Sequence, residues 1–142
     1  MKKKILIVTA DYYKEISFGL LKSAKSLIPK NFNSKNINVP GVFEIPITIS
    51  KNINKYDAFI VLGCVIKGET PHFDFISQAS INAIMKISIK SKKPIGMGII
   101  TCLTKKQAVE RKRKGAEATK AILSILSQKW EQILVLTIIQ EW

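Results

Sequence analysis

The sequence is poor in the side chains that many enzymes use for metal binding and nucleophilic attack. Its 142 residues include two cysteines and a single histidine, His72. Cys64 and Cys102 form no CxxC pair and no metal-ligand cluster with that histidine. One histidine also leaves a catalytic-triad mechanism without support. We therefore predict no metal site, and the two scattered cysteines fit a reduced, cytoplasmic setting.

Long apolar runs and phosphate-binding loops are also lacking. No segment reaches transmembrane length without a charged residue. The start, MKKKILIVTAD, imitates a signal peptide, but its apolar run from Ile5 to Ala10 is too short and Asp11 interrupts it. The sequence has no GxxxxGKS or GxxxxGKT loop, and GMG at 96–98 is too short for a dinucleotide fingerprint. We predict a protein with no membrane partner, and a nucleotide-hydrolysing mechanism has no support.

Acidic residues are scarce relative to basic ones. The 10 Asp and Glu residues against 23 Lys and Arg give a formal net charge of +13 at pH 7. Such a charge is typical of surfaces that bind nucleic acid or anionic membranes. Aromatic residues, however, are not interleaved with the basic ones, as stacking on bases would require. We favour a generally basic, solvated surface, whose field would also attract an anionic, phosphorylated substrate. A nucleic-acid-binding α/β module is the alternative, supported by the RKRK run at 111–114.

Apolar patterns divide the chain into alternating strands and helices. Apolar runs predict strands at 4–10, 37–39, 58–66 and 94–101. Helical spacing predicts helices at 13–28, 45–53, 71–90, 104–111 and 114–128, and Asp11 is placed to cap the first. This alternation is typical of βαβ units, so we predict a parallel sheet in one domain, 1–142. The apolar tail at 129–142 either extends the last helix or forms a further strand, and its composition favours packing on a neighbour.

The stretch from Leu62 to Phe75 combines a buried strand end, a polar loop and a helix start. Thr70 suits the N-cap of that helix and Pro71 its first position. His72 is therefore predicted at a helix N-terminus, beyond the carboxyl end of a strand. Ligands of open α/β sheets bind at such ends, free N–H groups there attract phosphate, and an imidazole carries protons near neutral pH.

Four segments, in order along the chain, closely resemble the 6,7-dimethyl-8-ribityllumazine synthase family. They are ILIVTADYY (5–13), PGVFEIP (40–46), LGCVIKGETPHFDFI (62–76) and PIGMGIITCLTKKQAVER (94–111). The resemblance implies a three-layer α/β/α, flavodoxin-like fold with a four-stranded parallel sheet. It also implies an enzyme of riboflavin biosynthesis that needs no cofactor. Its reaction condenses 5-amino-6-(D-ribitylamino)uracil with 3,4-dihydroxy-2-butanone 4-phosphate to 6,7-dimethyl-8-ribityllumazine, and releases phosphate and water.

The resemblance further implies roles for residues of this chain. His72 matches the proton-transfer residue, and the phosphate positions are Glu69, Thr70 and Arg111. The pyrimidine and ribityl positions are Tyr12, Val42, Phe43, Glu44, Cys64, Val65, Ile66 and Met97. Lys114 and Glu117 match a KGxE segment that lies near the site. Without the resemblance, Arg111 would be interpreted as an exposed cation, and Tyr12 and Phe43 as core residues.

This chain departs from the family pattern at several points. Met97 stands where the family usually has a stacking aromatic residue, and Tyr13 replaces a frequent Asn. Only residues 112–113 separate Arg111 from Lys114, where the family usually has a longer connection. The extra N-terminal segment that family members often pair with a neighbour's sheet is not expected here.

The resemblance implies a homopentamer, with a decamer or an icosahedral shell as larger alternatives. Its sites would lie between subunits, with Tyr12, Phe43 and His72 from one chain and Met97 and Arg111 from its neighbour. A catalytically silent binder of flavin or lumazine is a further alternative. The retained His72, Thr70 and Arg111 argue against that loss of activity.

Overall fold

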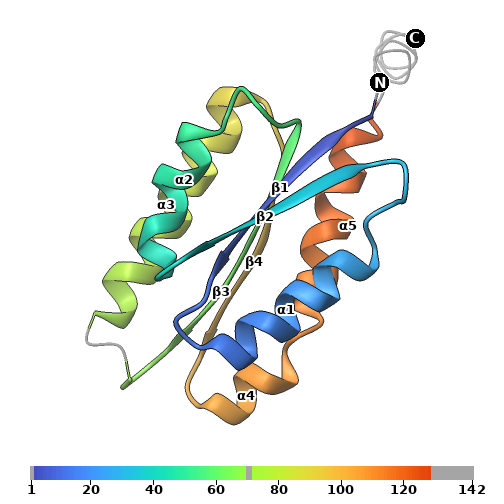
Figure 1. The fold of residues 1–142 in the computed structure, drawn as a ribbon. Helices are drawn as coiled ribbons and strands as arrows, with labels where there is room; N and C mark the ends of the chain where they lie inside the picture. Colours follow the sequence, from blue (N-terminus) through green and yellow to red (C-terminus); the bar gives the residue numbers. More distant parts are fainter. Residues whose placement is uncertain (1, 70–71, 129–142) are drawn as a thin grey trace, which may run out of the picture.

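The computed structural model describes residues 2–69 and 72–128. The strands are β1 (Lys4–Ala10), β2 (Asn33–Val39), β3 (Ala58–Ile66) and β4 (Ile95–Cys102). They form one parallel sheet in the order β2-β1-β3-β4 (Figure 1). The helices are α1 (Lys14–Ser26), α2 (Ile45–Lys51), α3 (Phe73–Ser91), α4 (Lys105–Glu110) and α5 (Lys114–Leu126), and a 3-10 turn, η1 (Val42–Glu44), precedes α2. The predicted four-stranded parallel sheet is confirmed.

The central strand β3, AFIVLGCVI, is buried at every position and pairs with β1 on one side and β4 on the other. Successive side chains of a strand point to opposite faces, so β3 contributes to two cores. Leu62 and Ile66 belong to one core, and Phe59 and Val61 to the other. A parallel sheet is stable when both faces are covered, and this explains the nearly continuous apolar run.

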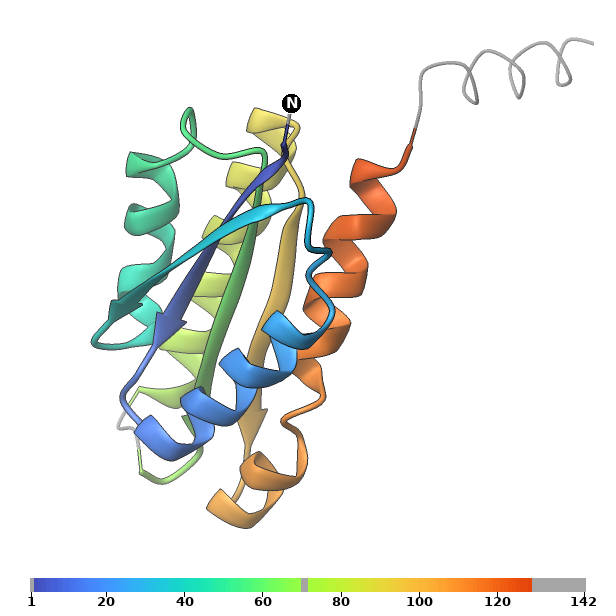
Figure 2. The same cartoon turned by 45° about the vertical axis from the view of Figure 1, so that its right-hand side comes forward.

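Two layers of helices cover the sheet. Residues of α1, α4 and α5 pack in the core on one face, and residues of η1, α2 and α3 pack in the core on the other (Figure 2). The structure therefore has the three-layer α/β/α arrangement that the flavodoxin-like prediction requires. Within 2–69 and 72–128, no helix is long and apolar enough to cross a membrane.

Several predicted boundaries were wrong. β2 begins at Asn33 rather than at residue 37, because an edge strand needs backbone pairing with β1 but few apolar side chains. Asp11 does not cap α1, whose N-cap residue is Tyr13 and has no side-chain cap bond. The second predicted helix ends at Lys51, before Ile53. The tail at 129–142 lies outside the described residues.

The start of α3 also differs from the prediction. His72 is the N-cap residue, and the helix begins at Phe73, later than the Thr70 cap and Pro71 start that the sequence suggested. Residues 70 and 71 themselves lie outside the described part of the chain. Asp74 lies in the first turn of the helix, where the helix dipole favours a carboxylate.

Glycine allows α5 to pack closely on the rest of its layer. A Cβ added at Gly115 would overlap the backbone carbonyl oxygen of Leu20 in α1. At Gly96 of β4, an added Cβ would overlap the carbonyl oxygen of Ala118 in α5. Both obstacles are backbone atoms, so a larger residue at either position would push an element away rather than turn a side chain.

We expect Gly115→Ala to lower the free energy of unfolding by about 1–3 kcal/mol, as overpacking of a core usually does. Gly19→Ala is the matched control, since Gly19 also lies in a helix but an added Cβ would meet only the Lys112 Cβ at 3.7 Å. That control should gain about 0.5–1 kcal/mol from the better helix propensity of alanine. Urea unfolding of both variants measures the difference, and an equal response would contradict the packing argument.

Candidate active site

A cavity of about 290 Å³ lies at the carboxyl ends of the central strands. Its wall combines a residue of the loop after β1, the turn that follows β2, the end of β3 and one residue of α3. The lining residues are Tyr12, Gly41, Val42, Phe43, Glu44, Cys64, Val65 and Ile76. Most of the predicted pyrimidine and ribityl residues therefore meet in one place, although they come from separate parts of the sequence.

Close packing on β3 brings the η1 turn to this cavity. A Cβ at Gly63 would lie 2.8 Å from Val42 Cγ1 and 3.0 Å from the Ala10 Cβ. Because glycine leaves this space free, Val42 lies directly against the strand and is buried. Phe43 and Glu44, the next residues, are then held at the rim.

The aromatic side chains of the cavity are not core residues. Tyr12 is 66% exposed and Phe43 is 63% exposed, although both are large and apolar. The Tyr12 ring packs edge-on against Tyr13, with ring centroids 4.9 Å apart. The interpretation of Tyr12 and Phe43 as core residues was therefore wrong for the single chain. Both rings are accessible to a planar ligand.

Two predicted pyrimidine residues lie outside this wall. Ile66 is buried in the core beneath α1 and α5, and its carbonyl accepts a hydrogen bond from Glu69 N at 3.3 Å. Met97 is half-buried on β4 and packs against the core on the α2 and α3 side. Conversely, Gly41 and Ile76 line the cavity but were not assigned to the site. Gly41 lies within the PGVFEIP segment, and Ile76 lies on the apolar face of α3. The sequence around each residue could therefore have identified it as a cavity residue.

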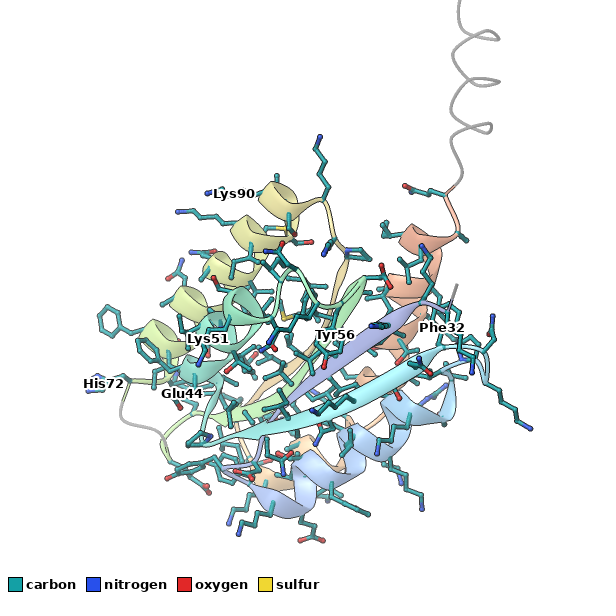
Figure 3. The ribbon with its side chains drawn as sticks, turned by 45° about the horizontal axis from the view of Figure 1, so that its top comes forward. Phe32, Glu44, Lys51, Tyr56, His72 and Lys90 are labelled. Carbon is teal, nitrogen blue, oxygen red and sulfur yellow. The ribbon has the colours of Figure 1, made fainter. Side chains whose placement is uncertain are left out.

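The loop between β3 and α3 carries the predicted proton-transfer residue. His72 is exposed, and its side chain makes no cap bond, while its carbonyl accepts a hydrogen bond from Ile76 N at 2.8 Å. The His72 ring lies 6.4 Å from the Phe75 ring. In the view of Figure 3, His72 projects away from the sheet at the start of α3. Glu69 is exposed in the same loop, and Thr70 lies outside the described residues.

A second cavity, of about 400 Å³, lies beside β4 and contains the predicted phosphate arginine. Its lining includes Thr101, Arg111, Lys114 and Glu117. Arg111 Nη1 donates hydrogen bonds to the Thr101 carbonyl at 3.2 Å and to Cys102 Sγ at 3.7 Å. Among the described residues, this cavity shares no lining residue with the first. The predicted phosphate arginine is thus separate, within one chain, from the predicted pyrimidine residues that line the first cavity.

The short link between α4 and α5 is a closed turn. Lys114 N donates to the Arg111 carbonyl at 3.0 Å, so the chain reverses between the two helices. The turn keeps Arg111 and Lys114 on one cavity in spite of the short connection. Lys114 Nζ lies 3.8 Å from Glu117 Oε2, in an exposed ion pair.

The Cys64 thiol at the first cavity is a poor nucleophile. Burial, together with the nearby Cys102, raises the pKa of Cys64 to about 12. Both cysteines are free and buried. Within the described residues, no group of three or more His, Cys, Asp or Glu side chains is arranged to hold a metal ion. Cys64 therefore forms part of the cavity wall as a neutral, packing side chain.

A parallel sheet with a ligand-sized cavity at the carboxyl ends of its strands defines a flavodoxin-like α/β protein with a small-molecule site. The family model for 6,7-dimethyl-8-ribityllumazine synthase matches residues 2–129. The chain therefore belongs to the 6,7-dimethyl-8-ribityllumazine synthase family, and the resemblance noted in the sequence is confirmed.

Proteins named 6,7-dimethyl-8-ribityllumazine synthase match nearly the whole chain. The protein of Bartonella tribocorum is 41% identical over 140 residues, which cover 91% of this chain and 93% of that protein. The protein of Methylorubrum populi is 38% identical, with 89% and 82% covered. That of Cutibacterium acnes is 34% identical, with 87% and 80% covered. The similarity thus extends over the whole sheet and both cavities.

We expect Cys64 to react slowly with iodoacetamide in the folded chain. Thiols react as thiolates, and with a pKa of about 12 only about one Cys64 thiol in 10⁴ is ionised at pH 8. The Cys102→Ala variant, whose only thiol is Cys64, isolates this rate; it removes the contribution of Cys102 to the raised pKa but keeps burial, which is the largest cause. The rate should rise about tenfold per pH unit between pH 8 and 11. A native rate equal to that of the urea-unfolded variant would contradict the raised pKa.

Proposed function

We propose that this chain condenses 5-amino-6-(D-ribitylamino)uracil with 3,4-dihydroxy-2-butanone 4-phosphate to 6,7-dimethyl-8-ribityllumazine, in riboflavin biosynthesis. One observation carries the proposal. Tyr12, the PGVFEIP segment and the Cys64-Val65 strand end line a single cavity. These are the positions that the family resemblance assigns to the pyrimidine and its ribityl chain. The whole chain would act as one lumazine synthase-like domain.

The proposed reaction needs positioning and proton transfer. The amine of the pyrimidine attacks the ketone, a Schiff base forms with loss of one water, phosphate leaves, and the ring closes with loss of a second water. Holding the two substrates together converts a bimolecular step into an effectively unimolecular one. In this proposal Tyr12 and Phe43 stack on the pyrimidine, and Glu44 accepts hydrogen bonds from ribityl hydroxyls. His72 moves the protons, and Arg111 binds the phosphate.

Mixing the purified chain with both substrates tests the function directly. The product is fluorescent, so its formation can be followed against the uncatalysed background. A rate no higher than that background, with a protein shown to be folded, would contradict the proposed activity.

We further propose that the enzyme is a cytoplasmic homopentamer, and that each site is built from two neighbouring chains. Two observations and one general rule support this assembly. The pyrimidine cavity and the Arg111 cavity are separate within one chain. Apolar side chains are exposed over η1, α2 and α3, namely Phe43, Ile47, Phe75, Met85 and Ile89. A head-to-tail contact with rotational symmetry closes into a ring. The two free cysteines fit a reducing compartment.

The His72→Ala variant should lower kcat for condensation by about 10²–10⁴-fold, the usual contribution of a positioned proton-transfer group. Binding of the pyrimidine alone should change little. His72 makes no side-chain cap bond, so α3 should remain intact. Gln78→Ala, an exposed change on the same helix, is the control. Stopped-flow fluorescence measures kcat, and an unchanged kcat would remove His72 from the mechanism.

The shared site predicts complementation between two inactive variants. In solution the enzyme should have the mass of five chains of 15.9 kDa each. His72→Ala and Arg111→Ala, unfolded and refolded together, should regain part of the activity, because some interfaces then combine an intact His72 with an intact Arg111. Light scattering gives the mass, and mass spectrometry verifies subunit exchange. An active monomer, or no recovery in a mixture that has exchanged, would rule out the shared site.

A further inference from the structure

The cavity beside β4 carries more positive charge than the predicted phosphate arginine alone supplies. Arg111, Arg113 and Lys114 line it, together with one carboxylate, Glu117. A phosphate monoester has a charge of about −1.5 to −2 at pH 7 and three strong acceptor oxygens. Without Arg113, the lining would hold two cations against Glu117, which leaves a phosphate under-neutralised. Arg113 was not among the residues that the sequence assigned to the site.

Backbone groups of the adjacent helix are not available for a phosphate. The first N–H groups of α5 already have partners: Lys114 N donates to the Arg111 carbonyl, Gly115 N to the Lys112 carbonyl, and Ala116 N to Ser23 Oγ. A helix N-terminus often binds anions through its free N–H groups, but here those donors are used by the turn and by α1. An anion in this cavity must therefore be bound by side chains.

The other two cations are already partly engaged. Arg111 uses Nη1 for the Thr101 carbonyl and Cys102 Sγ, which leaves the remaining edge of its guanidinium for a ligand. Lys114 is paired with Glu117 at 3.8 Å. By contrast, within 2–69 and 72–128 the Arg113 guanidinium has no hydrogen bond or ion pair. Of the three cations that line the cavity in this described part of the chain, it is the one whose donors are all free.

We propose that Arg113 is a second guanidinium that, together with Arg111, binds the phosphate of the phosphorylated substrate in this cavity. This inference rests on the proposed function. The tight turn between α4 and α5 makes it possible, because Arg113 is the N-cap residue of α5 and follows Arg111 by two positions. A planar guanidinium can bind two phosphate oxygens at once, which a lysine ammonium does not do. Arg113 is thus a substrate-binding residue, and its removal affects the phosphorylated substrate rather than the pyrimidine.

The test compares Arg113→Ala with Lys112→Ala. Lys112 is exposed, carries the same charge and does not line the cavity, so both changes remove one positive charge from the same turn. Arg113→Ala should raise KM for the phosphorylated ketone about tenfold, the effect of losing a charge-assisted hydrogen bond, and leave KM for the pyrimidine unchanged. Arg113→Lys should be intermediate. Lys112→Ala should behave as the unmodified enzyme.

Calorimetric titration with inorganic phosphate provides a readout that needs no turnover. Phosphate should bind about tenfold more weakly to Arg113→Ala than to Lys112→Ala. Equal phosphate affinity in these two variants, or an equal rise of both KM values, would overturn the role of Arg113. If the unmodified chain makes no lumazine but phosphate binding still depends on Arg113, the proposed function fails and the anion site stands. Should Arg113→Ala fail to fold, Arg113→Gln gives the same comparison.

Discussion

The complete burial of β3 is the constraint on which the rest of the structure depends. Its backbone pairs with β1 and β4, and its side chains enter the cores on both faces of the sheet. A strand enclosed in this way meets solvent only at its ends. Because all four strands are parallel, their carboxyl ends lie at the same edge of the sheet. The residues that follow β1 and β2 are therefore brought together there with the end of β3, and the cavity forms where they meet.

Glycine residues determine how closely the layers approach and, through that, where functional groups lie. Gly63 lets the turn after β2 lie against β3, which holds Phe43 and Glu44 at the cavity. Gly115 and Gly96 let α5 pack on α1 and β4 with almost no space between backbones. The turn from Arg111 to Lys114 is fixed to the sheet by this packing. Core packing and site geometry thus depend on the same few positions.

The site residues of one chain fall into two groups with different chemistry. The cavity by η1 is lined mainly by aromatic and aliphatic groups, as a planar heterocycle requires. The cavity beside β4 is dominated by cations, as a phosphate requires. In the described part of the chain, β4 is an edge strand that pairs with β3 alone. A cationic cavity at an open sheet edge is well placed to face a neighbouring subunit, and this geometry underlies the proposed shared site.

The sequence by itself determined the strands and most of the helices. The run AFIVLGCVI predicted β3 with its bounds, because a strand buried on both faces must be apolar throughout. The sequence did not predict where β2 begins, because backbone pairing at an edge leaves little trace in the side chains. The sequence also did not predict the first residue of α3. Suitable capping residues allow a helix to begin, but they do not determine the residue at which it begins. The four family segments identified the cavity residues Tyr12, Phe43 and Glu44.

Only the tertiary structure decided which of those residues meet. Ile66 shares a segment with the cavity residues Cys64 and Val65, yet its side chain is buried in the core beneath α1 and α5, and Met97 on β4 packs against the core on the α2 and α3 side. Arg113 looked like one cation in a basic run, because charge in a sequence does not reveal which face of a turn a side chain occupies. The structure brings it to the Arg111 cavity through the hydrogen-bonded turn between α4 and α5. Local patterns determine the elements, whereas contacts between distant segments depend on packing that no single segment encodes.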